Sequence, residues 1–288
     1  MKIAVHEGTF HADEVFAIAI IKFIYTDFEL IRTRNDAILC ECDLRIDVGG
    51  KNNPETGDFD HHLTGGAGER KNGIPFAACG LVWRHFGSQI CKSEYVYDYI
   101  EKRLIQNIDA LDNGYDPGLQ NLDFQVYNIS DMIDSFNRVW YEENNSNLDN
   151  FLQAVSIAKT IIENEIKRGK GFEKAISYVK EAVFNSTNPF YVILEKYCPW
   201  QDVLIPDTDM LFVIFPALEG GWRVRTIPQT RGSFQARKKL PAAWSGKRSD
   251  EFASLTGVKD ATFCHPACFI AGAETKEGAI KLAEKALS

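Results

Sequence analysis

The 288-residue sequence lacks the features of a secreted, disulfide-rich or membrane-spanning protein. It has no CxxC pair, and its seven cysteines are odd in number, which favours a reducing compartment. It shows no charged-then-apolar leader with a small-residue cleavage site. Its longest nearly apolar run, residues 15–24, is interrupted by Lys22 and is too short to cross a bilayer. We therefore expect a cytoplasmic protein without a membrane span.

The sequence also offers little support for a cysteine-based zinc site. Cys264, His265 and Cys268 could form part of a zinc site, but no second ligand pair lies near them in the sequence. Small buried thiols are the alternative that we favour.

Positive charge is in deficit overall but concentrated in one stretch. The formal net charge of −8 argues against a general nucleic-acid coat. Residues 221–249, called the basic strip below, contain no Asp or Glu. They carry eight basic residues: Arg223, Arg225, Arg231, Arg237, Lys238, Lys239, Lys247 and Arg248. Such a strip suits a bound polyanion, and the alternative is a solvated loop neutralised by counterions.

The length and the apolar patterns predict two domains. Strands are expected at 2–6, 28–34 and 44–48, and helices at 12–24, at 75–87 between Pro75 and Gly87, and at 93–111. This alternation predicts an α/β domain over residues 1–186, with a mostly parallel sheet flanked by helices. Two helices broken at Gly169 and Gly171 are expected within residues 147–185.

A smaller α+β domain is expected over residues 187–288. Strand-like runs lie at 190–195, 210–216 and 222–227, and a helix is expected from Thr275 to Leu287. The boundary near residue 186 separates the two predicted domains.

The most informative pattern is a concentration of His and Asp near the start of the chain. Four of the six histidines lie within the first 62 residues, with three aspartates among them: His6, His11, Asp13, Asp47, Asp60, His61 and His62. Imidazoles and carboxylates together are transition-metal or mixed Mn/Mg ligands. Their number exceeds the need of one ion, which predicts a two-metal centre of the kind that hydrolyses bonds at phosphorus. A capped N-terminal turn and a chance surface His pair are the alternatives.

The predicted topology explains how these residues converge. His6 and Asp47 end predicted strands, and ligand sites in parallel sheets lie beyond the carboxyl ends of the strands. Asp109 ends a predicted helix, where the helix dipole disfavours a carboxylate and a cation would compensate. Asp112 beside Asn113-Gly114 is interpreted as a turn residue, and His85 as a packing or capping residue.

Several motifs together resemble the MYG1 family, which belongs to the DHH phosphoesterase superfamily. They are HEGTFHADE, DVGGxxxPETGxFDHH, IDALDNG, WRVRTIP, LPAAWSG and FCHPACFIAGAETKEGAIKLA, spread over nearly the whole chain. The resemblance implies a DHH-type α/β domain followed by a smaller substrate-binding domain. It also implies two Mn²⁺ or Mg²⁺ ions and, from eukaryotic members, 3′–5′ exonuclease activity on RNA.

The resemblance assigns roles to individual residues. The positions that look like metal ligands are His6, His11, Asp13, Asp47, Asp60, His61 and Asp109, with Asp60 also catalytic. His62 resembles a catalytic residue that orients substrate or a bridging water. His11 stands where many superfamily relatives have Asp. Cys268 and Ala271-Gly272 replace a glycine and a glycine pair, although Gly272 remains a candidate for substrate contact.

These observations predict a metal-dependent phosphodiester hydrolase acting on RNA or short oligonucleotides. Five basic side chains are expected to contact phosphate: Arg223, Arg225, Arg231, Lys238 and His265. Trp222, Phe234 and Trp244 could stack on bases or pack in the core. The alternatives are a hydrolase of small phosphates such as pyrophosphate or dinucleotides, and a non-catalytic metal- or nucleotide-sensing module. A homo-oligomer is left open.

Overall fold

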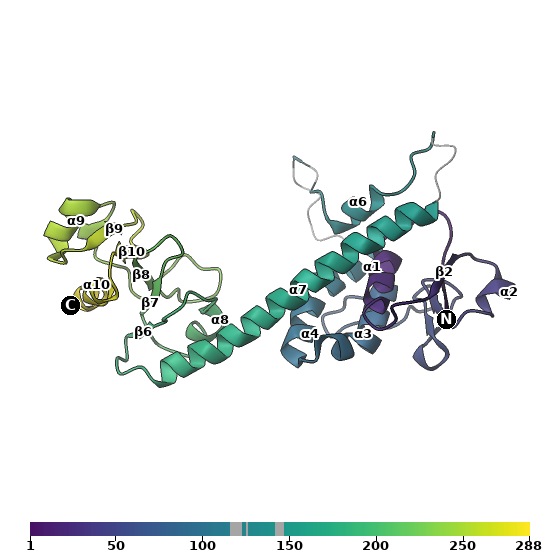
Figure 1. Cartoon of the computed structure of the whole chain (residues 1–288), viewed down its shortest axis with the longest axis horizontal. Coiled ribbons are helices and arrows are strands. Elements are labelled where there is room, and N and C mark those ends of the chain that lie inside the picture. Colours follow the sequence, from purple (N-terminus) through teal and green to yellow (C-terminus); the bar gives the residue numbers. More distant parts are fainter. Residues whose placement is uncertain (116–122, 125, 142–146) are drawn as a thin grey trace. The chain divides into compact units, whose positions relative to one another are not determined.

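The structure is a computed structural model, and it describes residues 1–115, 123–124, 126–141 and 147–288. It divides into two compact units, unit 1 (residues 1–170) and unit 2 (residues 171–288), shown in Figure 1. The division falls inside helix α7 (Asn147–Phe184), whereas the sequence placed a boundary near residue 186, just past the end of that helix.

Unit 1 is built on a five-stranded sheet in the order β2-β1-β3-β5-β4. Its strands are β1 (Lys2–Val5), β2 (Glu29–Arg32), β3 (Leu44–Ile46), β4 (Asn52–Asn53) and β5 (Asp58–Phe59). β1 pairs in parallel with β2 and β3, and β3 pairs in parallel with β5, whereas β4 pairs antiparallel with β5. The sheet is therefore mostly parallel, as predicted.

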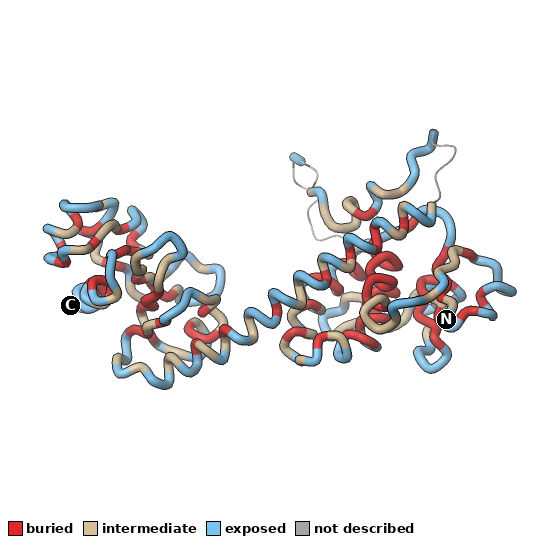
Figure 2. Tube along the Cα trace, in the orientation of Figure 1, coloured by how far each residue is buried: buried red, intermediate tan, exposed pale blue. Residues whose placement is uncertain are grey.

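Helices pack against this sheet and bury its apolar side chains. They are α1 (Ala12–Ile21), α2 (Asp36–Leu39), α3 (Ala78–Cys91), α4 (Glu94–Ile100), α5 (Gln106–Asp112) and α6 (Ile129–Asp134), with short turns at Pro54–Thr56 and a π-helical segment at Glu101–Ile105. All ten residues of α1 are buried (Figure 2). After Asp13 and Glu14 in its first turn α1 is apolar on every side, so it lies inside the core, in contact with α3, α5 and α6.

Glycines that were expected to end helices lie inside them instead. α3 continues through Gly87, where a Cβ atom would come within 2.8 Å of the Trp83 ring and 2.9 Å of the Tyr97 ring. α7 continues through Gly169, where a Cβ atom would lie 3.1 Å from the Tyr99 ring. The predicted breaks are wrong because these glycines allow close packing of neighbouring helices.

Unit 2 holds a second five-stranded sheet, in the order β6-β7-β8-β10-β9. Its elements are β6 (Tyr191–Ile193), α8 (Gln201–Leu204), β7 (Phe212–Pro216), β8 (Trp222–Thr226), a turn at Ala242–Trp244, α9 (Ser249–Thr256), β9 (Ala261–Cys264), β10 (Ile270–Ala273) and α10 (Lys276–Leu287). Only β6 and β7 pair in parallel within it. This confirms the predicted α+β character.

Each face of the second sheet buries its own apolar cluster. α10 packs against β7, β8, β9 and β10, with Val224 and Leu282 in that cluster. The other cluster joins Val213 and Phe215 to Trp200 and to Val179 of α7. No helix among the described residues is long and apolar enough to cross a membrane.

Candidate metal centre

The predicted His and Asp residues of unit 1 lie at the carboxyl ends of three neighbouring parallel strands. His6 directly follows β1, Asp47 follows β3, and Asp60 and His61 follow β5. Asp47 adopts a left-handed backbone conformation, with φ of 53°. This conformation turns the chain sharply at the strand end. Because the three strands are adjacent, these side chains share one edge of the sheet.

A first group of potential ligands joins His6, His11, Glu14 and Asp47, whose ligand atoms all lie within 4.8 Å of one another. His6 Nε2 lies 2.8 Å from Glu14 Oε1 and 3.4 Å from Asp47 Oδ2. His6 Nδ1 lies 2.9 Å from the Glu7 carbonyl oxygen. A carbonyl only accepts hydrogen bonds, so Nδ1 carries the proton and Nε2 faces the carboxylates. This is the orientation of a metal-binding imidazole.

Two further groups share members with the first. Asp47, His61 and His62 form one, and Asp13, His61 and Asp112 form the other. His61 Nε2 lies 3.4 Å from Asp47 Oδ1 and 3.2 Å from Asp112 Oδ2. Asp47 therefore directs one carboxylate oxygen to His6 and the other to His61. The shared residues make the three groups one continuous centre.

Two buried polar atoms of this centre have no hydrogen-bond partner: Asp47 Oδ1 and His61 Nε2. Buried polar atoms are nearly always satisfied, so each such atom requires an explanation. A divalent cation between them would satisfy both. The residues present therefore fit a metal ion, both in donor chemistry and in their unpaired atoms.

The centre opens into a cavity of about 400 Å³. Its wall includes every member of the ligand groups except Glu14, together with Arg34 and three polar residues of α6, namely Ser130, Asp131 and Asp134. His62 is 65% exposed at its side chain, whereas His61 is 9% exposed. The inner histidine is thus placed for a metal and the outer one for a molecule entering the cavity.

Electrostatics in the centre favour positive charge. Burial alone would lower the pKa of His6, but hydrogen bonds to Asp47 and Glu14 outweigh it and raise that pKa to about 10. Burial opposes the same effect at His61, where the nearby carboxylates of Asp112 and Asp47 raise the pKa to about 11. Burial and the neighbouring carboxylates raise the pKa of Asp13. The carboxylates of the centre therefore favour the protonated forms of His6 and His61.

Two predicted ligands have other partners. Asp60 Oδ2 accepts a hydrogen bond from Gly50 N at 2.6 Å, and its Oδ1 accepts from the His62 backbone N and from His62 Nδ1, both at 3.0 Å. Asp109 Oδ1 accepts a hydrogen bond from Gly80 N at 2.9 Å, and its Oδ2 forms an ion pair with Arg70 Nη2 at 2.8 Å that lacks hydrogen-bond geometry. The ligand groups described here include neither carboxylate.

Two members of the ligand groups were missed by the sequence reasoning. Glu14 follows Asp13 in the HADE motif, and its carboxylate also accepts a hydrogen bond from the backbone N of His11 at 3.0 Å. Asp112 was interpreted as a turn residue, although it lies one helical turn after Asp109. The i, i+3 spacing on α5 was the signal that could have identified it.

In unit 2, three predicted substrate residues share one region of the sheet. Arg223 and Arg225 alternate with Val224 on β8 and so lie on the same face. Gly272 on β10 pairs with Arg223. Arg223 lies over the Phe263 ring, and Arg225 lies over the rings of Trp200 and Phe269.

The other predicted phosphate contacts are dispersed. Arg231 forms an ion pair with Asp202, and Lys238 Nζ donates to the Leu287 carbonyl oxygen at 2.8 Å. His265 Nδ1 accepts from Ala267 N at 3.0 Å.

Of the predicted stacking residues, Trp244 is buried in the core, Trp222 packs against that core, and Phe234 is fully exposed. Cys264 and Cys268 are buried thiols, as favoured from the sequence.

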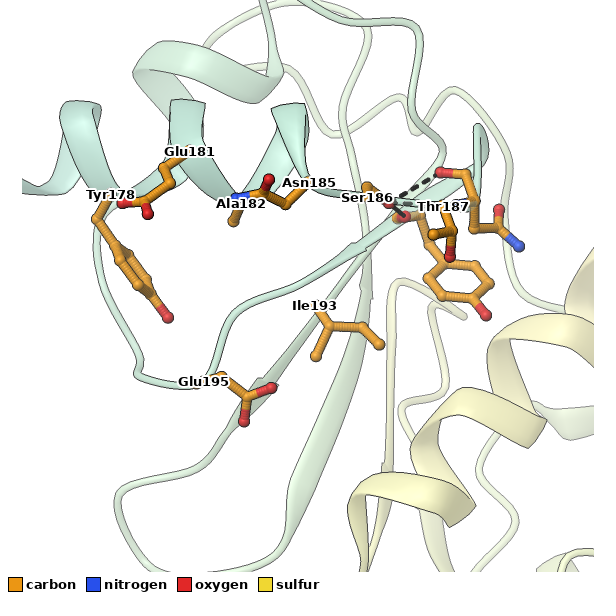
Figure 3. A pocket seen from close by; sticks show the side chains of 10 residues that line it. Tyr178, Glu181, Ala182, Asn185, Ser186, Thr187, Ile193 and Glu195 are labelled. Atoms are coloured by element: carbon orange, nitrogen blue, oxygen red, sulfur yellow. Dashed lines mark hydrogen bonds between the residues drawn. The ribbon is translucent and has the colours of Figure 1, made fainter.

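A separate cavity of about 380 Å³ lies in unit 2, between the end of α7 and β6 (Figure 3). Its wall includes Tyr178, Glu181, Asn185, Ser186 and Glu195. The described residues that line it include none of the six predicted substrate-binding residues.

Clustered imidazoles and carboxylates at the carboxyl edge of a parallel sheet define an α/β protein with a candidate metal centre. The chain belongs to the MYG1 exonuclease family, described as an uncharacterised protein family (UPF0160), whose model matches residues 2–287. This confirms the family predicted from the motifs. It assigns the chain to enzymes that hydrolyse phosphoesters.

Known relatives match along nearly all of the chain. It is 30% identical over 318 residues to a MYG1 protein of Dictyostelium discoideum, covering 100% of this chain and 97% of the relative. It is 28% identical to the MYG1 exonucleases of Mus musculus and Homo sapiens, covering 100% of this chain and 85% and 86% of those proteins. Among solved structures, a pGpG-specific phosphodiesterase, PggH from Vibrio cholerae, matches with a TM-score of 0.34 and 14% identity, covering 99% of this chain and 97% of that one.

Proposed function

We propose that this protein is a metal-dependent phosphodiester hydrolase that removes nucleotides from the 3′ end of RNA or short oligonucleotides. The observation that carries the proposal is the continuous centre of three ligand groups, in which Asp47 and His61 are shared and each keeps an unpaired buried atom. The exonuclease names of the mammalian relatives agree with it.

The proposed metal ligands are the members of the three groups with inward-facing donors. They are His6, His11, Asp13, Asp47, His61 and Asp112, with Glu14 supporting His6. This number suits two Mn²⁺ or Mg²⁺ ions. When bound, such ions would lower the pKa of a coordinated water and neutralise charge at phosphorus. In this proposal Asp112 takes the role that the sequence gave to Asp109.

His62 is proposed to bind the substrate phosphate. Its Nδ1 donates to Asp60 Oδ1 at 3.0 Å and lies 3.2 Å from Asp47 Oδ1, so Nε2 is the ring atom left for a ligand. The nearby Asp47 carboxylate raises the His62 pKa, which favours the cationic ring that a phosphate oxygen attracts. Asp60 thus acts by holding His62, and Arg34 supplies a second positive charge at the cavity wall.

In unit 2, Arg223 and Arg225 are the proposed phosphate contacts. They share one sheet face with Gly272, against which the Phe263 ring and the Thr262 hydroxyl pack. Phe263 and Phe269, over which these guanidinium groups lie, hold them in place.

The test is hydrolysis of end-labelled RNA in the presence of Mn²⁺ or Mg²⁺. We expect stepwise shortening from the 3′ end, abolished by a chelator. Asp47→Asn should reduce the rate by about 10²–10³-fold, because a metal contributes several kcal/mol to charge stabilisation. Asp27→Asn, at an exposed position, is the matched control and should retain the wild-type rate. No shortening with any divalent metal would sink the nuclease assignment.

A hydrolase of small phosphates is the second candidate, and the acidic net charge of −8 favours it. Long RNA would be repelled by most of this surface, whereas a dinucleotide or pyrophosphate would enter the cavity with little repulsion. Cleavage of dinucleotides without cleavage of a long oligonucleotide would select this candidate. Tight nucleotide binding without turnover in Mn²⁺, Mg²⁺ and Co²⁺ would instead indicate a sensing module.

A further inference from the structure

The start of helix α3 is bound by carboxylates from two other elements. Its N-cap residue, Ala77, has no side chain that could satisfy the first helical amides. Ala78 N donates to Asp13 Oδ2 at 2.9 Å, and Cys79 N donates to Asp13 Oδ1 at 2.6 Å. The next amide, Gly80 N, donates to Asp109 Oδ1 at 2.9 Å. Three consecutive amides that a helix leaves unpaired are therefore satisfied from α1 and α5.

This arrangement fixes Asp13, a member of the ligand groups. Both oxygens of Asp13 accept a hydrogen bond from α3, so its carboxylate plane is set by the position of that helix. The residue is fully buried, as are Asp109 and the three amide-bearing residues. A shift of the α3 start would move the Asp13 oxygens relative to His61 and Asp112, their neighbours in the centre.

Asp109 contacts both the start of α3 and a residue that precedes this helix. Its second oxygen, Oδ2, lies 2.8 Å from Arg70 Nη2. Arg70 also pairs with Glu101, donates to the Pro75 carbonyl oxygen at 3.3 Å and lies over the Phe76 ring. Asp109 thus joins α5, the start of α3 and the segment that leads into it.

The contact between Asp109 and the start of α3 requires a glycine at residue 80. A Cβ atom at residue 80 would come within 1.8 Å of Asp109 Oδ2 and 2.9 Å of Arg70 Nη2. The absence of a side chain lets the carboxylate lie directly against the helix. Asp112, three residues after Asp109 on the same helix, is placed by the same anchoring.

We propose that Asp109, with Arg70 and Gly80, is a positioning unit that holds Asp13 and Asp112 in metal-binding geometry, and that Asp109 is not itself a ligand. This rests on the proposed metal centre of the hydrolase. Outer groups that orient metal ligands usually change metal affinity by about 10–100-fold when they are replaced, without removing a binding site.

The test is Mn²⁺ binding, measured as site number and Kd by titration of the purified protein and by the electron paramagnetic resonance of free Mn²⁺. Asp109→Asn and Gly80→Ala should keep the wild-type number of sites and weaken the Kd by about 10–100-fold. Asp112→Asn should remove a site. Gly171→Ala is the matched control, since a Cβ atom there meets nothing within 4 Å, and it should bind Mn²⁺ as the wild type does.

A double variant separates positioning from ligation. If Asp109 acts through the start of α3, Asp109→Asn and Gly80→Ala disturb the same contact. The Kd of the double variant for Mn²⁺ should then be little higher than that of the single variant that binds Mn²⁺ more weakly. Arg70→Lys keeps the positive charge but cannot contact Glu101 and Asp109 at the same time, and it should raise the Kd for Mn²⁺ by a similar factor. If the Gly80→Ala variant fails to fold, the Arg70→Lys variant is used in its place.

Loss of one Mn²⁺ site in Asp109→Asn, with a wild-type Kd in Gly80→Ala or Arg70→Lys, would overturn the proposal by making Asp109 a ligand. Wild-type binding in all of these variants would also overturn it, as would a wild type that binds no Mn²⁺. RNA hydrolysis is measured separately. A protein that binds Mn²⁺ as expected but cleaves no phosphoester would reject the proposed function and leave the positioning unit supported.

Discussion

Asp109 and Asp112 lie one helical turn apart, and only one of them joins the groups of potential ligands. From the sequence, the helix-end position of Asp109 and its place in the family motif favoured it over a residue beside Asn113-Gly114. The structure gives Asp109 two partners of its own, Gly80 N and Arg70, and leaves Asp112 beside His61. Nothing local to the sequence could show that α3 begins next to Asp109.

Strand-end residues were easier to predict than helix residues. His6, Asp47 and His61 follow strands of a parallel sheet, and the topology alone brings them to one edge. Glu14 was missed because an acidic residue in the first turn of a helix has an ordinary explanation in the helix dipole. Its proximity to His6 depends on packing between α1 and β1.

Metal binding should release protons. In the metal-free centre the pKa of His6 is about 10 and that of His61 is about 11, so both rings are protonated at neutral pH. A metal binds the neutral imidazole and must displace these protons. Mn²⁺ affinity should therefore rise as the pH is raised from about 6 to about 8.

Calorimetric titration in buffers of different ionisation enthalpy counts these protons at one pH. His6→Gln should release about one proton fewer than the wild type. A binding heat that is the same in every buffer would contradict the expected protonation.

At the scale of the element, α7 shows why glycine is an uncertain indicator of helix ends. Gly169 is buried against Tyr99 and Val96, whereas Gly171 is exposed with nothing near its missing side chain. Sequence alone cannot distinguish a glycine that breaks a helix from one that another helix packs against, because the difference lies in a distant segment. The sequence predicted that this segment is helical, but not that α7 is one continuous helix.

The two glycines give a matched pair of variants. Gly171→Ala should stabilise the chain by about 0.5–1 kcal/mol, because alanine loses less backbone entropy on helix formation and meets no obstacle. Gly169→Ala should gain less or destabilise, since its Cβ atom would lie 3.1 Å from Tyr99 and 3.2 Å from Val96. Urea unfolding followed by circular dichroism measures both, and equal gains would contradict the packing described here.

At the scale of the whole molecule, several positive charges of the basic strip already have partners within unit 2. Arg231 and Lys247 form ion pairs with Asp202 and Glu251. Arg237 donates to the carbonyl oxygens of Met210 and Ile205, and Lys238 to that of Leu287. Half of the eight positive charges thus stabilise the second unit. A count of charges cannot anticipate most of this, because the partners of Arg231, Arg237 and Lys238 lie far along the chain, and only Lys247 pairs with a near neighbour.

RNA binding should therefore depend on salt less steeply than eight positive charges would suggest. If Arg223 and Arg225 each neutralise one phosphate, replacing either with Ala should reduce the slope of log K against log salt by about 0.7. Lys247→Ala should leave the slope unchanged, because its partner is Glu251. Fluorescence anisotropy of labelled RNA over a range of salt concentrations gives these slopes. If Lys247→Ala reduced the slope as much as Arg223→Ala, the assignment of Arg223 and Arg225 as the phosphate contacts would be contradicted.

Asp47 occupies a backbone conformation that glycine adopts freely and that costs other L-residues about 1–2 kcal/mol. The carboxylate shared between the ligand groups is thus attached at a position where the backbone alone would favour glycine. Selection for a more stable chain and selection for the centre act in opposite directions at this residue. The strand end is a place where the protein gives up stability to keep a chemical group, as enzymes commonly do at strained functional positions.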